Sequence, residues 1–276
     1  MTAPSYHVVF RTCDAVQALR GSRPFGLDKR TLIKVCFLSL LEALAEVPHS
    51  IVVLGDKLSD DLVSFFRRFE TGPGGVQLRL GNWGNDESIR QSLTAALLRP
   101  GEEWVYFCED DYLHQPFAFT WIDELIRRRN EVLSFRPGRW FMRALFRTAN
   151  EAPLFIHPAD YPDRYEPGKR QFSLVFLTRL NHWRQVSSTT FTFLGEVRSI
   201  RRYERHVRAA SVGARDDYLS RHLFSHVFYR GRGLCVSPIP GVATHMTEGV
   251  MTPLVDWKRI VDRQLSRLRT LEIPPA

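Results

Sequence analysis

Short apolar runs alternate with longer amphipathic segments through the first 114 residues of the chain. The apolar runs have the length and the Val, Ile and aromatic content of buried β-strands, and they lie at residues 6–10, 50–56, 76–80 and 104–107. The amphipathic segments place apolar side chains at helical spacing, and they lie at residues 27–47, 59–69 and 85–97. This alternation predicts an α/β fold with a doubly wound, mostly parallel sheet.

The second half of the sequence is less regular. Strand-like runs lie at residues 174–177 and 189–194, a helix is predicted to begin near Asp216, and a last strand is predicted at residues 234–238. We predict one domain in two halves, residues 1–114 and 115–253, followed by a basic amphipathic C-terminal helix at residues 254–276. The apolar positions of that helix can either seal the core or touch a membrane surface: Trp257, Ile260, Val261, Leu265 and Leu268.

Length and composition allow a complete hydrophobic core, because 44% of the 276 residues are apolar. No segment approaches the roughly 18 to 20 consecutive apolar residues of a membrane-spanning helix, and residues 1–6 lack the features of a secretory signal. We therefore expect a cytoplasmic protein. The cysteines are far apart and show no zinc-type spacing, so we expect reduced thiols: Cys13, Cys36, Cys108 and Cys235.

The chain is basic, with 38 Lys and Arg against 30 Asp and Glu and a formal charge of +8. Such an excess favours polyanionic partners: nucleoside diphosphates, anionic glycans, acidic lipid surfaces or nucleic acid. The aromatic pattern typical of RNA-binding sheets is absent, so we do not expect a nucleic-acid partner. The GxGxxG, GxxxxGKS/T, HExxH and GxSxG motifs are also absent, which argues against the corresponding nucleotide-binding, protease and hydrolase classes.

The apolar run at residues 104–108 stops at three consecutive carboxylates, Glu109, Asp110 and Asp111. A buried strand that ends in acids delivers negative charge to the rim of the sheet, where ligands of open α/β folds bind. Adjacent carboxylates repel each other unless they are protonated, paired with arginine or bound to a hard cation such as Mg²⁺ or Mn²⁺. We interpret Asp110 and Asp111 as metal ligands. A solvated acidic turn or a helix N-terminus is the alternative.

Two further positions can carry chemistry. His245 lies in a loop that glycine and proline punctuate, where an imidazole can complete an oxygen-rich Mn²⁺ site or simply hydrogen-bond within the loop. Asp216 and Asp217 precede a predicted helix. An aspartate at that place can act as a general base or as an N-cap.

Weaker signals mark nucleotide and acceptor sites. Polar residues that follow the first two strands or open the third helix can contact a nucleotide, although turns and caps explain them equally well: Arg11, Thr12, Asp14, Asp56, Asn85 and Ser88. Asp110 belongs to the same nucleotide-binding group. Aromatic rings can stack on a sugar while carboxylates meet its hydroxyls, although core packing is the commoner fate of such rings; the acceptor candidates are Asp160, Tyr161 and Trp183.

The order of these features resembles bacterial GT-A-fold glycosyltransferases, particularly the family-2-like enzymes of surface-polysaccharide assembly. The resemblance spans residues 6–248 and rests on the first strand, the acid after the second strand, the DxD-like motif at residues 109–111, the acidic pair and the late histidine. It implies a nucleotide-sugar held by residues 1–114 and an acceptor bound by residues 115–253. It also implies Mn²⁺ or Mg²⁺ between Asp111 and the donor diphosphate, Asp217 as the base with Asp216 second, and His245 as a metal or phosphate ligand.

The sequence departs from that family in two ways. The QxxRW signature of processive synthases is absent and no membrane helices follow, which argues against a processive polymer synthase. The acidic motif also has Glu-Asp-Asp where many relatives have Asp-x-Asp, so the ligating oxygens stay open.

The resulting hypothesis is a metal-dependent, non-processive glycosyltransferase with an inverting mechanism. A retaining mechanism is the alternative if Asp217 lies too far from the anomeric carbon. It would move a sugar from a nucleoside diphosphate, with UDP-sugars favoured, to a hydroxyl of a glycan or of a lipid-linked acceptor. A lipid-linked acceptor would bring the basic C-terminal segment to the inner face of the membrane. The alternatives are a nucleotidyltransferase and a non-catalytic polyanion-binding module on the same scaffold.

Overall fold

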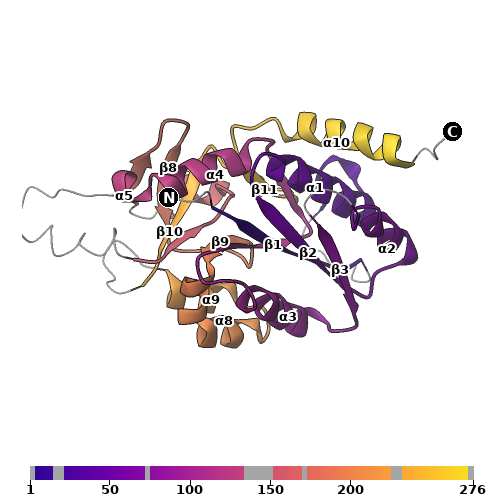
Figure 1. The fold of residues 1–276 in the computed structure, drawn as a ribbon. Helices are drawn as coiled ribbons and strands as arrows, with labels where there is room; N and C mark the ends of the chain where they lie inside the picture. Colours follow the sequence, from indigo (N-terminus) through magenta and orange to yellow (C-terminus); the bar gives the residue numbers. More distant parts are fainter. Residues whose placement is uncertain are drawn as a thin grey trace, which may run out of the picture.

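The computed structural model describes residues 4–14, 22–71, 75–133, 152–169, 173–224 and 232–272. A nine-stranded sheet runs through the molecule in the order β3-β2-β1-β4-β9-β6-β10-β8-β7 (Figure 1). Its strands are β1 (Tyr6–Thr12), β2 (His49–Asp56), β3 (Val76–Gly81), β4 (Trp104–Glu109), β6 (Leu154–Ile156), β7 (Val175–Leu177), β8 (His182–Val186), β9 (Phe193–Glu196) and β10 (Leu234–Ile239).

The first four strands of the chain form a parallel sheet with β1 at its centre. β1 pairs with β2 and β4, and β2 pairs with β3. The register places Thr12 opposite Gly55 and Arg11 opposite Glu109, so the carboxyl ends of these strands meet at one edge. The predicted α/β class with a doubly wound sheet is confirmed. The less regular half adds the antiparallel pairs of β9 with β4 and β6, and of β8 with β10 and β7.

Helices cover both faces of the sheet, as Figure 1 shows. Apolar residues of α1, α2 and α4 pack against one face, and those of α3, α7, α8 and α9 pack against the other. The helices are α1 (Lys29–Leu44), α2 (Asp60–Arg67), α3 (Asn85–Leu97), α4 (Ala118–Arg127), α5 (Arg129–Val132), α7 (Val197–Arg202), α8 (Glu204–Ser211), α9 (Asp216–Leu223) and α10 (Trp257–Glu272), with 3-10 turns η1 (Pro24–Gly26) and η2 (Pro162–Tyr165).

Helix starts follow local chemistry. The Asp28 carboxylate accepts hydrogen bonds from the N–H groups of Arg30 and Thr31 and so begins α1. Ser59, the first residue of the predicted segment 59–69, precedes α2, although its side chain makes no capping hydrogen bond. The residue before α3 is Gly84 rather than Asn85, because the chain there takes a φ of 74°, which glycine adopts without strain.

A separate two-stranded sheet was not predicted from the sequence. β5 (Tyr112–His114) pairs antiparallel with β11 (Ala243–His245), with His245 opposite Tyr112. Three-residue strands are too short to show a hydrophobic period, so their pairing depends on contacts between distant parts of the chain. This pairing brings the loop after β4 next to His245. The strand predicted at residues 189–194 similarly begins only at Phe193.

α10 seals the molecule against α1. Trp257, Ile260 and Val261 are buried with Leu32 and Cys36, so these positions serve the core. Within the part of the chain that is described, no helix combines the length and apolar content needed to cross a membrane. All four cysteines are unpaired thiols.

Candidate active site

A polar cavity of about 490 Å³ opens at the carboxyl ends of β1, β2 and β4, the edge where open α/β sheets bind ligands. The ends of these strands, the start of α1 and the turn before α3 supply its lining: Arg11, Thr12, Cys13, Lys29, Asp56, Lys57, Gly84, Asn85, Glu109, Asp110 and Asp111. All the residues expected to bind nucleotide, except Asp14 and Ser88, belong to this wall.

Protein groups hold both carboxylate oxygens of Asp110. Lys29 Nζ lies 2.6 Å from Oδ1, while the Thr12 hydroxyl and the Cys13 N–H donate to Oδ2 at 2.9 and 3.0 Å. Asp110 therefore ties the end of β1 and the start of α1 to the end of β4. A metal held by Asp110 would lie beside the ammonium group of Lys29, a partner that the sequence did not reveal.

The neighbouring carboxylate, Asp111, pairs with His245. His245 Nε2 lies 2.9 Å from Asp111 Oδ2, and its ring stacks on Tyr112 with centroids 5.3 Å apart. Burial opposes ionisation of Asp111, but His245, Lys29 and Arg11 outweigh it and hold the pKa of this carboxyl below its usual value. Burial also opposes the charge on His245, but Asp111 raises the pKa of this imidazole. The residue before β5 and the last residue of β11 thus hold the Asp111 carboxylate and the His245 imidazole side by side.

This pair fits a divalent cation. Within the described residues, the buried Asp111 Oδ1 has no hydrogen-bond partner, which is costly for a carboxylate oxygen. One carboxylate and one imidazole form a ligand set that suits Mn²⁺. No three His, Cys, Asp or Glu side chains of the described part are grouped to hold a metal by themselves. A cation here would take its remaining ligands from water or substrate, as Mg²⁺ often does from phosphates.

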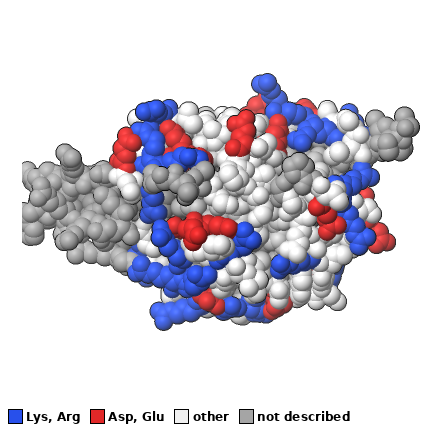
Figure 2. Space-filling view, in the orientation of Figure 1, with Lys and Arg blue, Asp and Glu red and all other residues white. Residues whose placement is uncertain are grey.

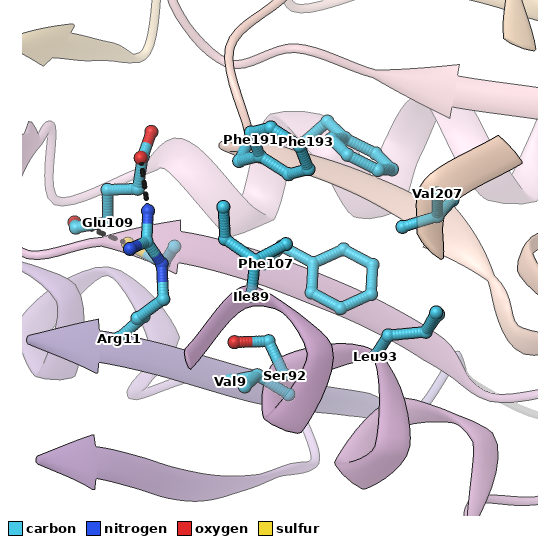
Figure 3. A pocket seen from close by; sticks show the side chains of 11 residues that line it. Val9, Arg11, Ile89, Ser92, Leu93, Phe107, Glu109, Phe191, Phe193 and Val207 are labelled. Atoms are coloured by element: carbon cyan, nitrogen blue, oxygen red, sulfur yellow. Dashed lines mark hydrogen bonds and ion pairs between the residues drawn. The ribbon is translucent and has the colours of Figure 1, made fainter. Parts of the chain in front are cut away.

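Arg11 connects the ends of β1 and β4 with α3. Its guanidinium lies 2.6 Å from Glu109 Oε1 and donates to Asn85 Oδ1 at 2.9 Å and to Ser88 Oγ at 3.3 Å. Figure 3 shows Arg11 and Glu109 at one end of a small pocket whose other walls are mainly apolar, such as Phe107. That pocket measures about 20 Å³, room for roughly one water, so it is no substrate site.

Asp56 and Asp14 shape the backbone around the cavity. Asp56 accepts hydrogen bonds from the N–H groups of Trp83 at 2.6 Å and Gly84 at 3.0 Å, and this fixes the turn before α3. Asp14 accepts from the N–H of Ser59 at 3.1 Å and from its hydroxyl at 2.6 Å, which anchors the start of α2. The partners of Asp14 are thus distant in sequence, so it anchors a helix rather than forming a turn, and its nucleotide role stays a prediction.

The acidic pair at the start of α9 divides into two unlike residues. Asp217 is exposed and pairs with Arg221, whose hydrogen bond lowers the pKa of Asp217. Asp216 is half-buried, and burial together with the charge of Glu109 raises its pKa to about 7. Arg11 and His245 also act on Asp216 electrostatically. Of the two, Asp216 is therefore the residue whose carboxyl responds to the charged groups Glu109, Arg11 and His245, while the role of either residue as the base stays a prediction.

A second cavity, of about 390 Å³, includes His245, so the Asp111–His245 pair lies between two cavities. Loops supply most of its lining: Tyr161, Pro162, Asp163, Glu166, Lys169, Thr190, His245, Gly249 and Val250. The Tyr161 hydroxyl hydrogen-bonds to that of Tyr112, which also contacts Thr190 Oγ1 at 2.8 Å. Tyr161 is thus an acceptor candidate that the structure brings to the site.

The other two acceptor candidates lie in the interior. Trp183 is 0% exposed in the core, and its indole N–H donates to Thr178 Oγ1 at 3.3 Å. Asp160 is 1% exposed and lies 2.5 Å from Arg184 Nη2, with Arg164 at 3.5 Å. Neither side chain reaches a sugar in a cavity, so both expectations are wrong for this structure. The Trp183 ring packs in the core, and the Asp160 carboxylate belongs to a buried ion cluster.

Sequence reasoning missed Lys29 and Tyr112. Lys29 follows the N-cap Asp28 and lies far in sequence from Asp110. The lysine after a capping acid, at a helix start that faces the strand ends, is the signal that could have indicated it. Tyr112 was visible beside the acids, but its role as the platform for His245 depends on the pairing of β5 with β11.

Basic side chains are spread over the surface. On the face in Figure 2, Lys and Arg lie in several groups along the borders, and one compact acidic group lies between basic ones. The excess of positive charge on this face is therefore divided rather than gathered in one unbroken stripe.

Comparisons with known proteins give similarity in fold only. No family model and no curated protein matches the chain. A structure of S. aureus TarS 1-349 in complex with UDP is 10% identical over 84% of this chain and 57% of that chain, with a TM-score of 0.49. A longer TarS structure is covered over only 35% of its length.

Two further solved structures differ in their named activities. The galactosyltransferase LgtC, in complex with donor and acceptor sugar analogs, is 11% identical over 98% of this chain and 97% of that chain, with a TM-score of 0.44. A 4-diphosphocytidyl-2C-methyl-D-erythritol synthase is 13% identical over 77% and 85%, with a TM-score of 0.38. Similarities of this size leave the activity to be inferred from the site.

Proposed function

We propose that this protein is a glycosyltransferase that moves a sugar from a nucleoside diphosphate to an acceptor hydroxyl. The observation that carries the proposal is the Asp111–His245 pair between a polar cavity at parallel strand ends and a second cavity lined by Tyr161 and other loop residues. The donor would occupy the larger cavity, where Arg11 can contact the negatively charged diphosphate. The acceptor would occupy the smaller cavity. UDP and sugar analogs are the ligands named for TarS and LgtC, and ligands of these classes are proposed here.

Asp111 and His245 would hold Mn²⁺ or Mg²⁺ together with oxygens of the donor diphosphate. A cation bound there supplies positive charge that stabilises the departing diphosphate. The unpartnered Asp111 Oδ1 and the fixed His245 ring support this assignment. Tyr112 orients the imidazole, which keeps both ligands in one arrangement before substrate binds.

Asp216 would act as the general base. It would take the proton of the acceptor hydroxyl as that oxygen attacks the anomeric carbon, while the nucleoside diphosphate leaves from the opposite face. A single displacement of this kind inverts the anomeric configuration. A carboxyl whose pKa lies near 7 is well matched to a proton transfer at neutral pH.

A lipid-linked acceptor would be approached at a membrane surface. The exposed side of α10 carries basic residues that can meet anionic headgroups: Lys258, Arg259, Arg263, Arg267 and Arg269. The apolar side of the same helix is occupied by α1, so electrostatic contact is the form of attachment proposed.

A thermal-shift screen of nucleoside diphosphates with and without Mn²⁺ tests the function. A ligand that binds only the folded protein raises its melting temperature, and UDP is expected to do so more strongly with Mn²⁺. Asp111→Ala should lose the Mn²⁺-dependent part of the shift. If no nucleoside diphosphate stabilises the protein with or without Mn²⁺, the proposed function is wrong. A nucleotide response without any release of diphosphate from sugar donors would favour a binding module.

A further inference from the structure

The ammonium group of Lys29 lies inside the acidic motif of the donor cavity. Its Nζ is 2.6 Å from Asp110 Oδ1, and the two side chains are 15% and 10% exposed. A lysine amine is ordinarily a cation at neutral pH, and an ion pair at this distance favours the charged form. The cavity therefore carries its own cation beside the carboxylates that were expected to need one.

The contacts of Lys29 leave donors for a ligand. An ammonium group has three N–H donors, and within the described residues Lys29 uses one, to Asp110 Oδ1. Asp110 Oδ2 is already satisfied by Thr12 and the Cys13 N–H, so this carboxylate holds Lys29 in position from one side. Both Lys29 and Asp111 line the same cavity.

We infer that Lys29 is a resident cation of the donor site. Its ammonium group stays paired with Asp110 and donates a hydrogen bond directly to the diphosphate. The inference rests on the proposed function for the identity of that ligand. It has two consequences. Diphosphate binding has a part that needs no metal, and a divalent ion is recruited by Asp111 and His245 against the nearby positive charge of Lys29.

The variant Lys29→Met distinguishes a ligand-binding role of Lys29 from a purely structural ion pair. In EDTA, its affinity for inorganic pyrophosphate should fall about tenfold or more, as expected when one charge-assisted hydrogen bond is lost. Without pyrophosphate, its affinity for Mn²⁺ should rise about threefold or more, because a neighbouring positive charge is removed. Calorimetric titration measures both affinities. Misfolding would weaken both, so changes in opposite directions identify Lys29.

Arg30→Met is the matched control, because Arg30 follows Lys29 on α1, is exposed outside the cavity lining, and its loss changes the charge equally. The affinities of this control for pyrophosphate and for Mn²⁺ should stay within about threefold of the unmodified protein, and Lys29→Arg should recover most of the pyrophosphate affinity. Equal losses of pyrophosphate affinity in Lys29→Met and Arg30→Met, or unchanged pyrophosphate binding in Lys29→Met, would overturn the inference.

The same titrations distinguish this inference from the proposed function. If UDP with Mn²⁺ binds the unmodified protein and Lys29→Met binds pyrophosphate equally well, the function stands and the inference fails. If pyrophosphate binding depends on Lys29 while no nucleoside diphosphate binds, the inference stands as an anion site and the function fails.

Discussion

The two cavities beside the Asp111–His245 pair are built from different kinds of structure. The larger is lined by the ends of β1, β2 and β4 and by the starts of α1 and α3, whereas the smaller is lined mainly by loops around Tyr161, Thr190 and Gly249. Strand ends are positioned by the register of a buried parallel sheet, while loop positions depend on contacts between distant segments. The larger cavity, proposed for the donor, is therefore set by the sheet itself, whereas the smaller cavity, proposed for the acceptor, is set by loops.

The largest expected effect concerns Asp216, the proposed general base. Asp216→Asn should lower kcat by about 10²–10⁴-fold, the usual contribution of a general base, because an amide cannot take the acceptor proton. Asp217→Asn should change kcat by less than about threefold, because Asp217 is exposed and pairs with Arg221. Release of the nucleoside diphosphate from a sugar donor measures both. The opposite ranking would return the role to Asp217.

The pH dependence of activity also tests whether Asp216 is the base. Burial and Glu109 raise the pKa of Asp216 to about 7, so activity should fall as the pH drops below about 7 and the base becomes protonated. A pH–rate profile of Asp216→Asn should lack this limb. The effect on stability has the opposite sign. The folded protein keeps this proton up to about pH 7, whereas the unfolded chain loses it near the ordinary aspartate pKa of 3.8, so the contribution of Asp216 to the free energy of unfolding is lost as the pH rises between these values.

The acceptor side should depend most on its buried ion cluster. Asp160→Ala should lower the free energy of unfolding by about 3–5 kcal/mol, because it leaves Arg184 and Arg164 without their buried partner. Denaturant unfolding measures this loss. Asp163→Ala, an exposed change in the same region, should cost no more than about 0.5 kcal/mol. Equal, small effects would mean that Asp160 does not support the loops.

The pair between the cavities should control metal affinity. His245→Ala removes one of two proposed protein ligands and should weaken Mn²⁺ binding by at least the roughly 10–100-fold that the loss of supporting residues costs in metal sites. Titration of Mn²⁺ in the presence of UDP measures the change. Tyr112→Phe keeps the ring under His245 and is the control; it should retain most of the affinity.

The smallest effect is expected on the donor side, at the anchor of α2. Asp14→Ala should cost about 1 kcal/mol of stability, the typical value for a helix-start acceptor, since it releases the N–H and hydroxyl of Ser59. UDP affinity should stay close to that of the unmodified protein once folding is corrected for. A large and selective loss of UDP binding would restore Asp14 to the nucleotide site.

The fold was predictable where one period persisted over several residues. The strands near residues 6, 50, 76 and 104 and the helices between them follow from apolar runs and helical spacing, and the parallel sheet follows from their alternation. β5, β6, β8 and β11 were missed because short strands that pair with distant partners carry little pattern of their own.

The sequence allowed the residue types at the strand ends to be predicted as a site. It did not allow the partner of each side chain to be predicted. Asp110 and Asp111 look equivalent in sequence, yet one receives Lys29 and the other His245. Trp183 was expected to meet a sugar because its ring is suited to stacking, but its place in β8 points it into the core. Which of two chemically identical residues binds which partner depends on contacts with distant parts of the chain, and the local sequence does not show those contacts.

The most direct test is anomalous diffraction from crystals grown or soaked with Mn²⁺ and UDP. The account predicts a manganese peak bonded to the Asp111 carboxylate and His245 Nε2, with diphosphate oxygens completing its coordination and Lys29 still paired with Asp110. An intact Asp111–His245 hydrogen bond without manganese beside it, while UDP is bound elsewhere on the molecule, would contradict the account.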